Sequence, residues 1–458
     1  MGSDNGFHSG LGWRVEEREH AVVVGAGIAG LTAAAALAGR FERVTVLERD
    51  ALGEAPGFRP GVPQSRHLHS LMGAGQRALD GLLPGFTERL YEAGAVPLRT
   101  PYDHLWLSPA GWCHRFAPSH TVPSATRELV EHVVRTSVAG LDGVRFRDQT
   151  ETVGFAGDAA RVTGVRVRTR GGDRSGGVDE VPADLVVNAS GRGSGGRGWL
   201  RALGLDEPEV ERIDSRPGYS SRLYEMPAGF ADEWRIISIQ PGEGQPLRGG
   251  ALVPVEGGRW LVSLYGYLDD HPPVDPEGFL EFAGSLRHPV LHDVVRDAVP
   301  AGPVHGFRHM ANERYRYEDL PAWPDGLLLA GDALCAVNPV YAQGMSMAAM
   351  TAETLGRLLD GDAGCRATQK EIAAGNERAW QVATGADLAY LTDVGGEGAR
   401  DAGEYMARLM ALALVDADVN RTFFDVMMML AEPDALASPE LAARVARGPS
   451  RPPAGPAC

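Results

Sequence analysis

The start of the chain alternates short apolar runs with glycine turns. Residues 21–24 (AVVV) and 44–47 (VTVL) are apolar runs of strand length, and the alanine-rich segment 31–38 between them has the composition of a helix. A buried strand, a helix and a second buried strand within about 30 residues are typical of the opening of a doubly wound parallel sheet. The pattern therefore predicts an α/β fold whose first unit is Rossmann-like.

The middle of the chain changes to a two-residue period. Apolar and polar residues alternate between residues 144 and 187, and residues 215–270 contain several more strand candidates. Two of these, 251–255 and 259–265, are joined by a Glu-Gly-Gly connection of the kind that closes a hairpin. This part predicts an antiparallel sheet that is separate from the Rossmann-like part.

Helical spacing dominates the rest. It is present at 72–83 and 127–138, and it returns over nearly all of 351–447. The polar start (1–17) and the proline-rich end (448–458) show no apolar period, so we expect flexible termini there.

The composition is that of a folded globular protein. The chain has 458 residues, 44% of them hydrophobic and 23% charged, which corresponds to two to four structural units. Its formal net charge of −16 repels phosphate backbones, which argues against a nucleic-acid partner. No run approaches 18 apolar residues, and the N-terminus lacks the pattern of a signal peptide. We therefore expect a cytoplasmic protein without membrane insertion.

Cysteine and lysine are both scarce. The four cysteines have no paired spacing, so we expect neither a metal site nor a disulfide framework, and a reducing compartment. Lys370 is the only lysine among the 44 basic residues. Any phosphate group that this protein binds must therefore be held by arginine or by backbone N–H groups.

A glycine-rich turn follows the first predicted strand. Gly25, Gly27 and Gly30 have the spacing in which the first glycine allows a tight turn, the second admits a pyrophosphate and the third lets a helix pack on the sheet. Glu48 ends the second strand, where a carboxylate can accept a hydrogen bond from a ribose 2′-hydroxyl. The alternative is a glycine turn that binds nothing. The motif predicts a dinucleotide site formed by Gly25, Gly27, Ala29, Gly30, Glu48 and Arg49.

A second element, about 300 residues later, favours FAD over NAD. Residues 325–333 (DGLLLAGDA) place Asp332 at the end of a short apolar strand, and residues 338–345 (NPVYAQGM) then lead into a helix. An aspartate there can hold ribityl hydroxyls, and the helix N-terminus can stabilise negative charge on a reduced isoalloxazine. A simple helix cap is the alternative role for Asp332. We add to the predicted FAD site the residues Asp332, Pro339, Gln343, Gly344 and Met345.

These segments and the loop 59–69 (RPGVPQSRHLH) resemble FAD-dependent monooxygenases of the p-hydroxybenzoate hydroxylase-like superfamily. In motif the chain is most similar to the actinobacterial polyether polyene epoxidases, and the resemblance covers most of residues 20–360. It implies a glutathione-reductase-like FAD-binding domain (18–100, 120–212 and 305–362), an inserted antiparallel β-sheet substrate domain (101–119 and 213–304) and a C-terminal helical cap (363–447).

The resemblance also implies a reaction. NADH or NADPH would dock transiently and reduce FAD, and O2 would then give a flavin C4a-(hydro)peroxide that epoxidises or hydroxylates an apolar, polyketide-like small molecule. Arg127 begins a helix where relatives often have an FAD-contacting arginine; a surface charge is its alternative role. The chain has no second dinucleotide motif, so the choice of nicotinamide stays open, as does the oligomeric state.

The candidate catalytic residues lie in the most specific motif of the resemblance. Gln64, Arg66 and His67 are expected near the isoalloxazine or the substrate entrance, although for His67 and His69 a purely structural role in the loop is equally open. We expect the substrate chamber between the antiparallel sheet and the flavin. Candidate walls are the aromatic and methionine-rich segments 219–224, 260–267 and 427–429.

Two residues depart from the family pattern. Asn188 stands where relatives usually carry Asp, and Ala342 stands where they carry Gly beside the flavin. These departures leave open a flavin-free auxiliary or binding protein. Further alternatives are an aromatic-ring hydroxylase of a polycyclic intermediate and an FAD-dependent reductase without oxygen insertion. Halogenation is disfavoured, because the chain lacks both the lysine and the Trp-x-Trp-x-Ile-Pro segment of flavin halogenases.

Overall fold

The computed structural model describes residues 18–170, 177–193, 195–230, 232–308, 311–391 and 397–449. The termini expected to be flexible, 1–17 and most of 448–458, lie outside the described residues.

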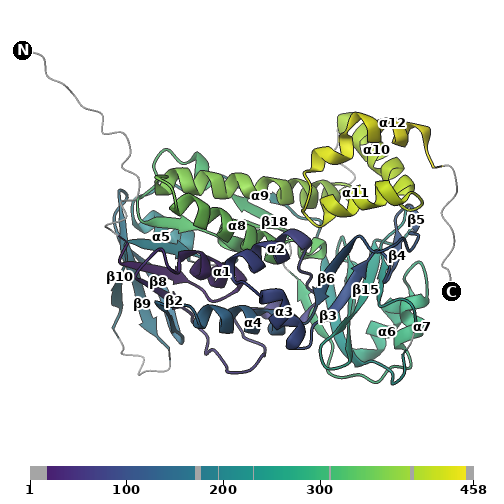
Figure 1. Ribbon diagram of the computed structural model, residues 1–458, viewed down its shortest axis with the longest axis horizontal. Coiled ribbons are helices and arrows are strands. Elements are labelled where there is room, and N and C mark those ends of the chain that lie inside the picture. The colour runs from purple at the N-terminus through teal and green to yellow at the C-terminus, as the bar shows by residue number, and fades with distance from the viewer. Residues whose placement is uncertain are drawn as a thin grey trace, which may run out of the picture.

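A five-stranded parallel sheet forms one half of the molecule (Figure 1). All of its strand pairs run parallel, and every residue of its central strand is buried. Strands covered on both faces must be continuously apolar, which is the pattern seen in the sequence. The predicted α/β fold with a Rossmann-like opening is confirmed. The strand order is β19 (Leu327–Leu329), β11 (Leu185–Asn188), β1 (His20–Val24), β2 (Arg43–Leu47) and β7 (Val144–Arg147).

The helix α1 (Ile28–Leu37) is enclosed on nearly all sides. Nine of its ten residues are buried, and it packs against both α4 (Arg127–Ala139) and α8 (Gly344–Leu359). Its alanines let these helices approach closely, so the alanine-rich composition reflects the packing of the layer.

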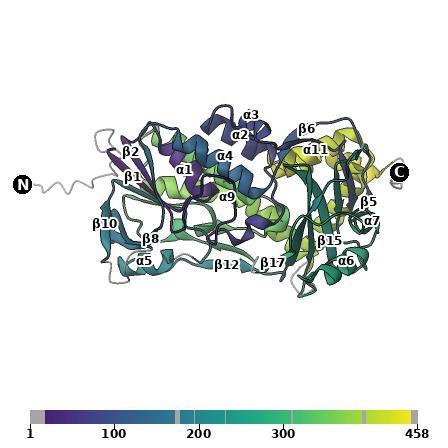
Figure 2. The same ribbon diagram turned by 90° about the horizontal axis from the view of Figure 1, so that it is seen from below.

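A seven-stranded sheet forms the other end of the molecule (Figure 2). Its pairs are antiparallel as predicted, except that β14 and β4 run parallel. No hairpin joins these two strands, which are more than 100 residues apart, so the connection does not fix their relative direction. The order is β17 (His305–Arg308), β13 (Gly218–Glu225), β16 (Arg259–Gly266), β15 (Arg248–Val255), β14 (Ile236–Ile239), β4 (His104–Ser108) and β5 (Gly111–Trp112).

Helices cover both faces of this sheet. On one face, α6 (Pro276–Gly284) and α7 (Val290–Val295) pack into an apolar cluster with Leu252 and Val262. On the other face, Trp106 of β4 contacts Phe423 and Phe424 of α11, with ring centroids 5.8 and 5.7 Å apart.

The C-terminal helices form two groups. The long helix α9 (Cys365–Leu388) packs beside α8 and β19, whereas α10 (Glu397–Ala413), α11 (Ala417–Met427) and α12 (Pro439–Arg447) gather over the end of the seven-stranded sheet (Figure 1). The region expected as a cap over 363–447 therefore has one helix that packs against the parallel sheet and a separate three-helix cluster.

Three small sheets and several short helices complete the described chain. No helix in these residues is both long and apolar enough to cross a membrane. The sheets are β10 (Asp179–Pro182) with β9 (Val162–Thr169) and β8 (Thr150–Gly157), β12 (Val210–Ile213) with β18 (Asn312–Tyr315) and β20 (Cys335–Ala336), and β3 (Val96–Thr100) with β6 (His120–Ser124). The short helices are α2 (Gly73–Leu82), α3 (Phe86–Glu92), α5 (Gly196–Ala202), η2 (Pro63–Arg66), η3 (Tyr317–Asp319), η4 (Gly331–Ala333), η5 (Pro339–Tyr341) and η6 (Pro433–Ala437).

Candidate functional site

A cavity of about 710 Å³ lies across the carboxyl ends of the parallel strands. Its walls include Val24 and Leu47, the last residues of β1 and β2, and Ala189 and Gly331, which follow β11 and β19 at one or two residues' distance. Ligands of doubly wound sheets bind at this edge, where the strand order reverses. The topology alone therefore places a ligand here.

The glycine turn shapes one wall of the cavity. Gly25 has φ +100°, and a Cβ there would lie 2.7 Å from the Ala189 carbonyl oxygen. A Cβ on Gly30 would lie 1.8 Å from the Gly25 carbonyl oxygen, so this glycine lets α1 pack against the turn. At Gly27, the N-cap of α1, a Cβ would meet nothing within 4 Å. The N–H groups at the start of α1 thus lie along the cavity with no side chain in front of Gly27, which suits a phosphate.

Glu48 lies on the cavity wall at the end of β2. Its carboxylate accepts hydrogen bonds from the backbone N–H groups of Ala26 (2.9 Å) and Asp50 (3.0 Å), and Arg59 Nη1 lies 3.1 Å from Oε2. The side chain is 7% exposed, and each carboxylate oxygen can accept more than one hydrogen bond. Glu48 can therefore hold a ribose hydroxyl while it stays fixed by the protein.

Arg59 connects this carboxylate to α4. Its guanidinium donates to Glu131 Oε1 through Nε (2.9 Å) and Nη2 (2.5 Å), and Arg127 Nη2 lies 2.9 Å from Glu131 Oε2. Burial by itself raises the pKa of Glu131, but Arg127 and Arg59 outweigh it and hold this pKa below its ordinary value. Glu48, Arg59, Glu131 and Arg127 therefore form a continuous line of buried charges, which we call the charge chain.

Arg127 ends the charge chain at the cavity wall. Its side chain is 6% exposed, and Nη1 has no hydrogen-bond partner among the described residues. A buried guanidinium donor without a partner is costly unless an anion meets it. Next to it, burial and the Arg127 charge lower the pKa of His69 to about 4, so the His69 ring is neutral at pH 7.

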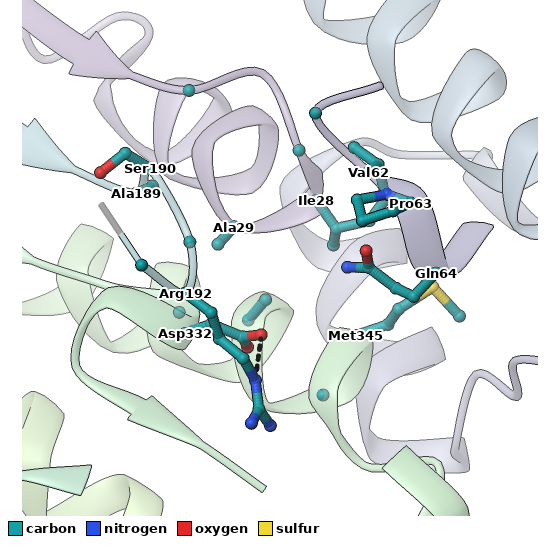
Figure 3. A pocket seen from close by; sticks show the side chains of 18 of the residues that line it. Ile28, Ala29, Val62, Pro63, Gln64, Ala189, Ser190, Arg192, Asp332 and Met345 are labelled. Atoms are coloured by element: carbon teal, nitrogen blue, oxygen red, sulfur yellow. Dashed lines mark hydrogen bonds and ion pairs between the residues drawn. The ribbon is translucent and has the colours of Figure 1, made fainter. Parts of the chain in front are cut away.

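Asp332 lies on the cavity wall, with its carboxylate directed toward Arg192 (Figure 3). Arg192 Nε lies 3.4 Å from its carboxylate, while the two terminal nitrogens of Arg192 donate to the carbonyl oxygens of Ala311 (2.6 Å) and Val337 (2.8 Å). Arg192 thus orients Asp332 and anchors the start of the next loop. Arg192 was not among the residues predicted for the site.

The segment 338–343 leads from this loop into α8. Ala342 adopts a left-handed conformation with φ +56°, and Gln343 is the buried N-cap residue of α8. Pro339, Ala342, Gly344 and Met345 line the cavity. A left-handed conformation favours glycine, so Ala342 is strained where relatives carry glycine.

Asn188 lies between β1 and β19 and is fully enclosed. Its Oδ1 accepts hydrogen bonds from the N–H (3.3 Å) and the hydroxyl (2.5 Å) of Ser190. An amide oxygen is enough for this turn, so the change from carboxylate to amide leaves the turn intact.

The three candidate catalytic residues occupy different surroundings. Gln64 lines the cavity beside Val62 and Pro63 (Figure 3). Arg66 stacks over Phe58, with its Cζ 3.6 Å from the ring centroid. His67 is buried, shares a 2.8 Å hydrogen bond with Ser221 and has its pKa lowered to about 3 by burial, with smaller effects of the neighbouring positive charges.

His67 marks the boundary between the cavity and the seven-stranded sheet. Its ring lies 4.4 Å from that of Tyr219 and 6.0 Å from that of Phe307. Among the described residues of that sheet, only Phe307 lines the cavity. None of the three segments named as candidate walls, 219–224, 260–267 and 427–429, lines the cavity, and Met428 and Met429 are buried in other apolar clusters. The predicted chamber between sheet and flavin stays a prediction.

Most predicted cofactor residues come together at the cavity. Four predicted residues do not line the cavity but lie within two residues, along the chain, of residues that do: Gly30, Arg66, His67 and Gln343. Arg59, Glu131 and Arg192 were missed, because each acts through another side chain and no local motif marks such a role. The predicted residues that line the cavity are Gly25, Gly27, Ala29, Glu48, Arg49, Gln64, Arg127, Asp332, Pro339, Gly344 and Met345.

These residues fit FAD on three grounds. The start of α1 is open at Gly27, Arg127 offers an unpartnered cationic N–H, and the cavity is long enough to include both Glu48 and Gln64. A diphosphate needs the first two, and a dinucleotide with a large ring needs the third.

A family model described as an FAD binding domain matches residues 18–386. The chain therefore belongs to this family of FAD-dependent monooxygenases and hydroxylases, and FAD is its cofactor. Protein Rv3254 of Mycobacterium tuberculosis is 34% identical over 352 residues, which are 75% of this chain and 73% of that protein. Kynurenine 3-monooxygenase of Salinispora tropica is 29% identical over 72% of this chain and 70% of its own length.

Solved structures show the same fold. The flavin-dependent brominase Bmp2 superimposes with a TM-score of 0.68 at 14% sequence identity, covering 93% of this chain and 98% of that one. At this identity the likeness concerns the fold alone, not the brominating activity.

Proposed function

We propose that this protein is an FAD- and NAD(P)H-dependent monooxygenase that epoxidises or hydroxylates an apolar, polyketide-like natural-product intermediate. The observation that carries the proposal is the composition of one continuous cavity. Polar and charged groups (Glu48, Arg127, Asp332) suit a dinucleotide along one part, whereas the part near Gln64 has apolar walls.

The chain's own residues bind and orient. The start of α1 and Arg127 would hold the diphosphate, Glu48 the adenosine ribose, and Asp332, fixed by Arg192, the ribityl chain. Bound FAD supplies the activation of O2 after reduction by NAD(P)H, which is typical of the family. The N-terminus of α8 would stabilise negative charge on the ring system, since the N–H groups of its first turn carry partial positive charge.

The apolar walls argue for the substrate class. Val62, Pro63 and Met345 lie beside Gln64 on the cavity wall (Figure 3), and the side chains of Leu68 and Phe307 also line the cavity. Burying a charged substrate against such groups would remove its charge from water. This desolvation costs roughly several kcal/mol per ion unless a group of opposite charge pairs with the substrate. The same walls exclude water from the reaction. We therefore propose an uncharged, largely hydrocarbon substrate, converted in the cytoplasm without a nucleic-acid partner.

Aromatic-ring hydroxylation is a second candidate. Phe307 of the cavity wall belongs to an aromatic cluster with Tyr219 and His67, and aromatic faces bind ring substrates by stacking. Another relative, 26% identical over 71% of this chain, is named 3-hydroxybenzoate 6-hydroxylase, which agrees with this possibility.

Product analysis with labelled oxygen tests the proposal. The purified holoprotein is incubated with 18O2, NADH or NADPH, and a panel of polyenes and polycyclic aromatics, and products are identified by mass spectrometry. We expect one 18O atom per oxygenation and substrate-dependent O2 uptake. Labelled polyene products support epoxidation, and labelled polycyclic products support ring hydroxylation.

Two results contradict the proposal. A reduced product without O2 uptake would instead assign a reductase. Failure of the chain to take up FAD would favour an auxiliary protein. A Gly25→Val variant is the control, because its side chain would collide with Ala189 and block the turn.

A further inference from the structure

A buried carboxylate near the end of α9 holds the loop that precedes α8. Asp387 is 0% exposed and accepts hydrogen bonds from three side chains. The donors are Asn312 Nδ2 at 2.6 Å, Asn338 Nδ2 at 3.0 and 3.1 Å to the two oxygens, and the Tyr341 hydroxyl at 2.6 Å. Among the ion pairs of the described residues, none involves Asp387.

The donors form a closed network. The Asn338 N–H donates to Asn312 Oδ1 (2.7 Å), and Asn338 Oδ1 accepts the N–H of Val340 (3.1 Å). Asn312 and Asn338 thus use their amide oxygens on the loop backbone and their amide nitrogens on Asp387. Every polar group of the two amides has a defined partner, which fixes the path of the loop.

The loop reaches the FAD cavity at both ends. Val337 and Pro339 line the cavity at its start, and Ala342 and Gly344 line it where α8 begins. Asn338, the N-cap residue of η5, and Tyr341, the last residue of η5, both donate hydrogen bonds to Asp387. Asp387 therefore holds the segment that leads directly into the N-terminus of α8.

The network around residue 387 requires a carboxylate at its centre. Three donors converge on Asp387, and only an ionised carboxylate offers two oxygens that accept without donating. An asparagine would set its own N–H2 group against one of the donors. Burial raises the pKa of Asp387, and the hydrogen bonds from Tyr341, Asn338 and Asn312 act in the opposite direction because they stabilise the ionised form. A buried carboxylate with these three donors is therefore a costly way to attach α9. The cost is understandable if the position of the loop 338–343 matters for the cavity.

We propose that Asp387 is a positioning residue for FAD: it fixes the loop 338–343 and thereby the N-terminal turn of α8 against the isoalloxazine. The family match ends at residue 386, so the family model does not include this residue. The inference rests on FAD binding and not on the proposed substrate or on oxygen transfer.

The test compares two buried polar residues at different places. Asp387→Asn changes one atom and removes the second accepting oxygen. Asn420→Ala is the matched control, because Asn420 is 1% exposed and donates to the Ala413 carbonyl oxygen (2.9 Å) within the C-terminal helix cluster. For each protein we would measure the Tm without FAD, the Kd for FAD by flavin fluorescence, and the midpoint potential and visible circular dichroism of the bound flavin.

We expect both variants to lower the Tm, but only Asp387→Asn to affect the flavin. Its Kd should rise roughly tenfold or more, the effect of losing one hydrogen bond to a charged group, with a shifted midpoint potential and an altered dichroism spectrum. Asn420→Ala should keep the wild-type values. Tyr341→Phe, which removes one donor and leaves the charge, should change the flavin in the same direction by less.

An Asp387→Asn protein that melts earlier but binds FAD with wild-type Kd, potential and spectrum would overturn the proposal, since a merely structural role predicts that result. If Asp387→Asn does not fold, Tyr341→Phe decides by the same readouts. None of these measurements uses a substrate, so a wrong substrate class would leave the outcome unchanged.

Discussion

The residues that hold this site together are mostly paired charges, and the charge chain shows how. Glu131 is shared by Arg59 and Arg127, and its carboxylate oxygens each face one of them. The chain has a single lysine, and the cationic side chains that line the cavity in the described residues are those of arginines. The guanidinium suits such a site, because it binds a carboxylate through two N–H groups and keeps others for a ligand.

Glu131→Gln should therefore damage both stability and FAD binding. The change leaves two buried arginines short of one charge, which costs about 3 kcal/mol of unfolding free energy. It also frees Arg127, so we expect a higher Kd for FAD. Urea unfolding and FAD titration measure the two effects.

Glu128→Gln is the control for this prediction. Glu128 lies one turn earlier on α4, half-buried, with a 3.2 Å hydrogen bond from Ser65, and its loss should cost less than about 1 kcal/mol. Equal losses in the two variants would contradict a special role for Glu131.

Ala342→Gly should stabilise the protein. At φ +56° an alanine bears the left-handed penalty that glycine avoids, and part of this gain is offset by the greater freedom of glycine in the unfolded chain. We expect a net gain of about 0.5–1 kcal/mol in urea unfolding without FAD. Ala342→Val, with a branched side chain at the same φ, should instead destabilise. A loss of stability in the glycine variant would show that the methyl group packs favourably enough to offset the strain.

At the scale of elements, the sequence predicts those helices and strands whose formation depends on interactions between residues close together in the chain. The apolar runs and glycine spacing are enough to predict β1, α1 and β2, because one buried strand, one turn and one enclosed helix define them. The parallel pairing of β14 with β4 and the contact of Asn312 with Asp387, 75 residues away, are not predictable in this way. Each of these contacts depends on which surfaces meet when distant segments fold together. The periodicity of apolar residues in a single sequence does not indicate such pairings.

The residues of the candidate site also fall into a group that local motifs predict and a group that they do not. Motifs predict Gly25, Gly27 and Asp332, since backbone geometry at the cofactor demands those residue types. Arg192 and Glu131 escaped prediction, because their task is to orient another side chain, and many residues at many positions could do that.

The docking of the three-helix cluster onto α9 gives an element-scale prediction. Arg378 of α9 donates to the carbonyl oxygens of Val426 in the last turn of α11 and of Met429 and Ala431 just beyond it, where carbonyl groups have few partners within the helix. Arg378→Ala should leave these carbonyl groups poorly satisfied and loosen α11, so limited proteolysis should cut near residue 430 several times faster than in the wild type. Arg408→Ala, on an exposed pair of α10, should not change the rate. Equal rates in all three proteins would mean that apolar packing alone holds the cluster.

At the scale of the whole molecule, three histidines with lowered pKa values make stability depend on pH. Burial lowers the pKa of His67 to about 3 and of His69 and His104 to about 4. The unfolded chain binds protons at these sites near pH 6.5, whereas the folded protein binds them only near pH 4 at His69 and His104 and near pH 3 at His67. Because the unfolded state then holds more protons, stability is full above pH 6.5 and falls as the pH decreases from 6.5 toward 4.

His104 isolates this effect best. It lies on β4 facing the helix cluster, beside Trp106 at 6.1 Å, and neither ring nitrogen has a hydrogen-bond partner among the described residues. His104→Phe keeps an aromatic ring and removes the proton site. Wild type should lose about 2 kcal/mol more than this variant between pH 7.5 and pH 5, which is 1.36 kcal/mol for each of the 1.5 pH units below 6.5. Urea unfolding at the two pH values measures the difference, and all other titrating groups cancel between the proteins. Parallel stability curves would mean that the folded protein accepts a proton at His104, and thus that water reaches the interface between the sheet and the helix cluster.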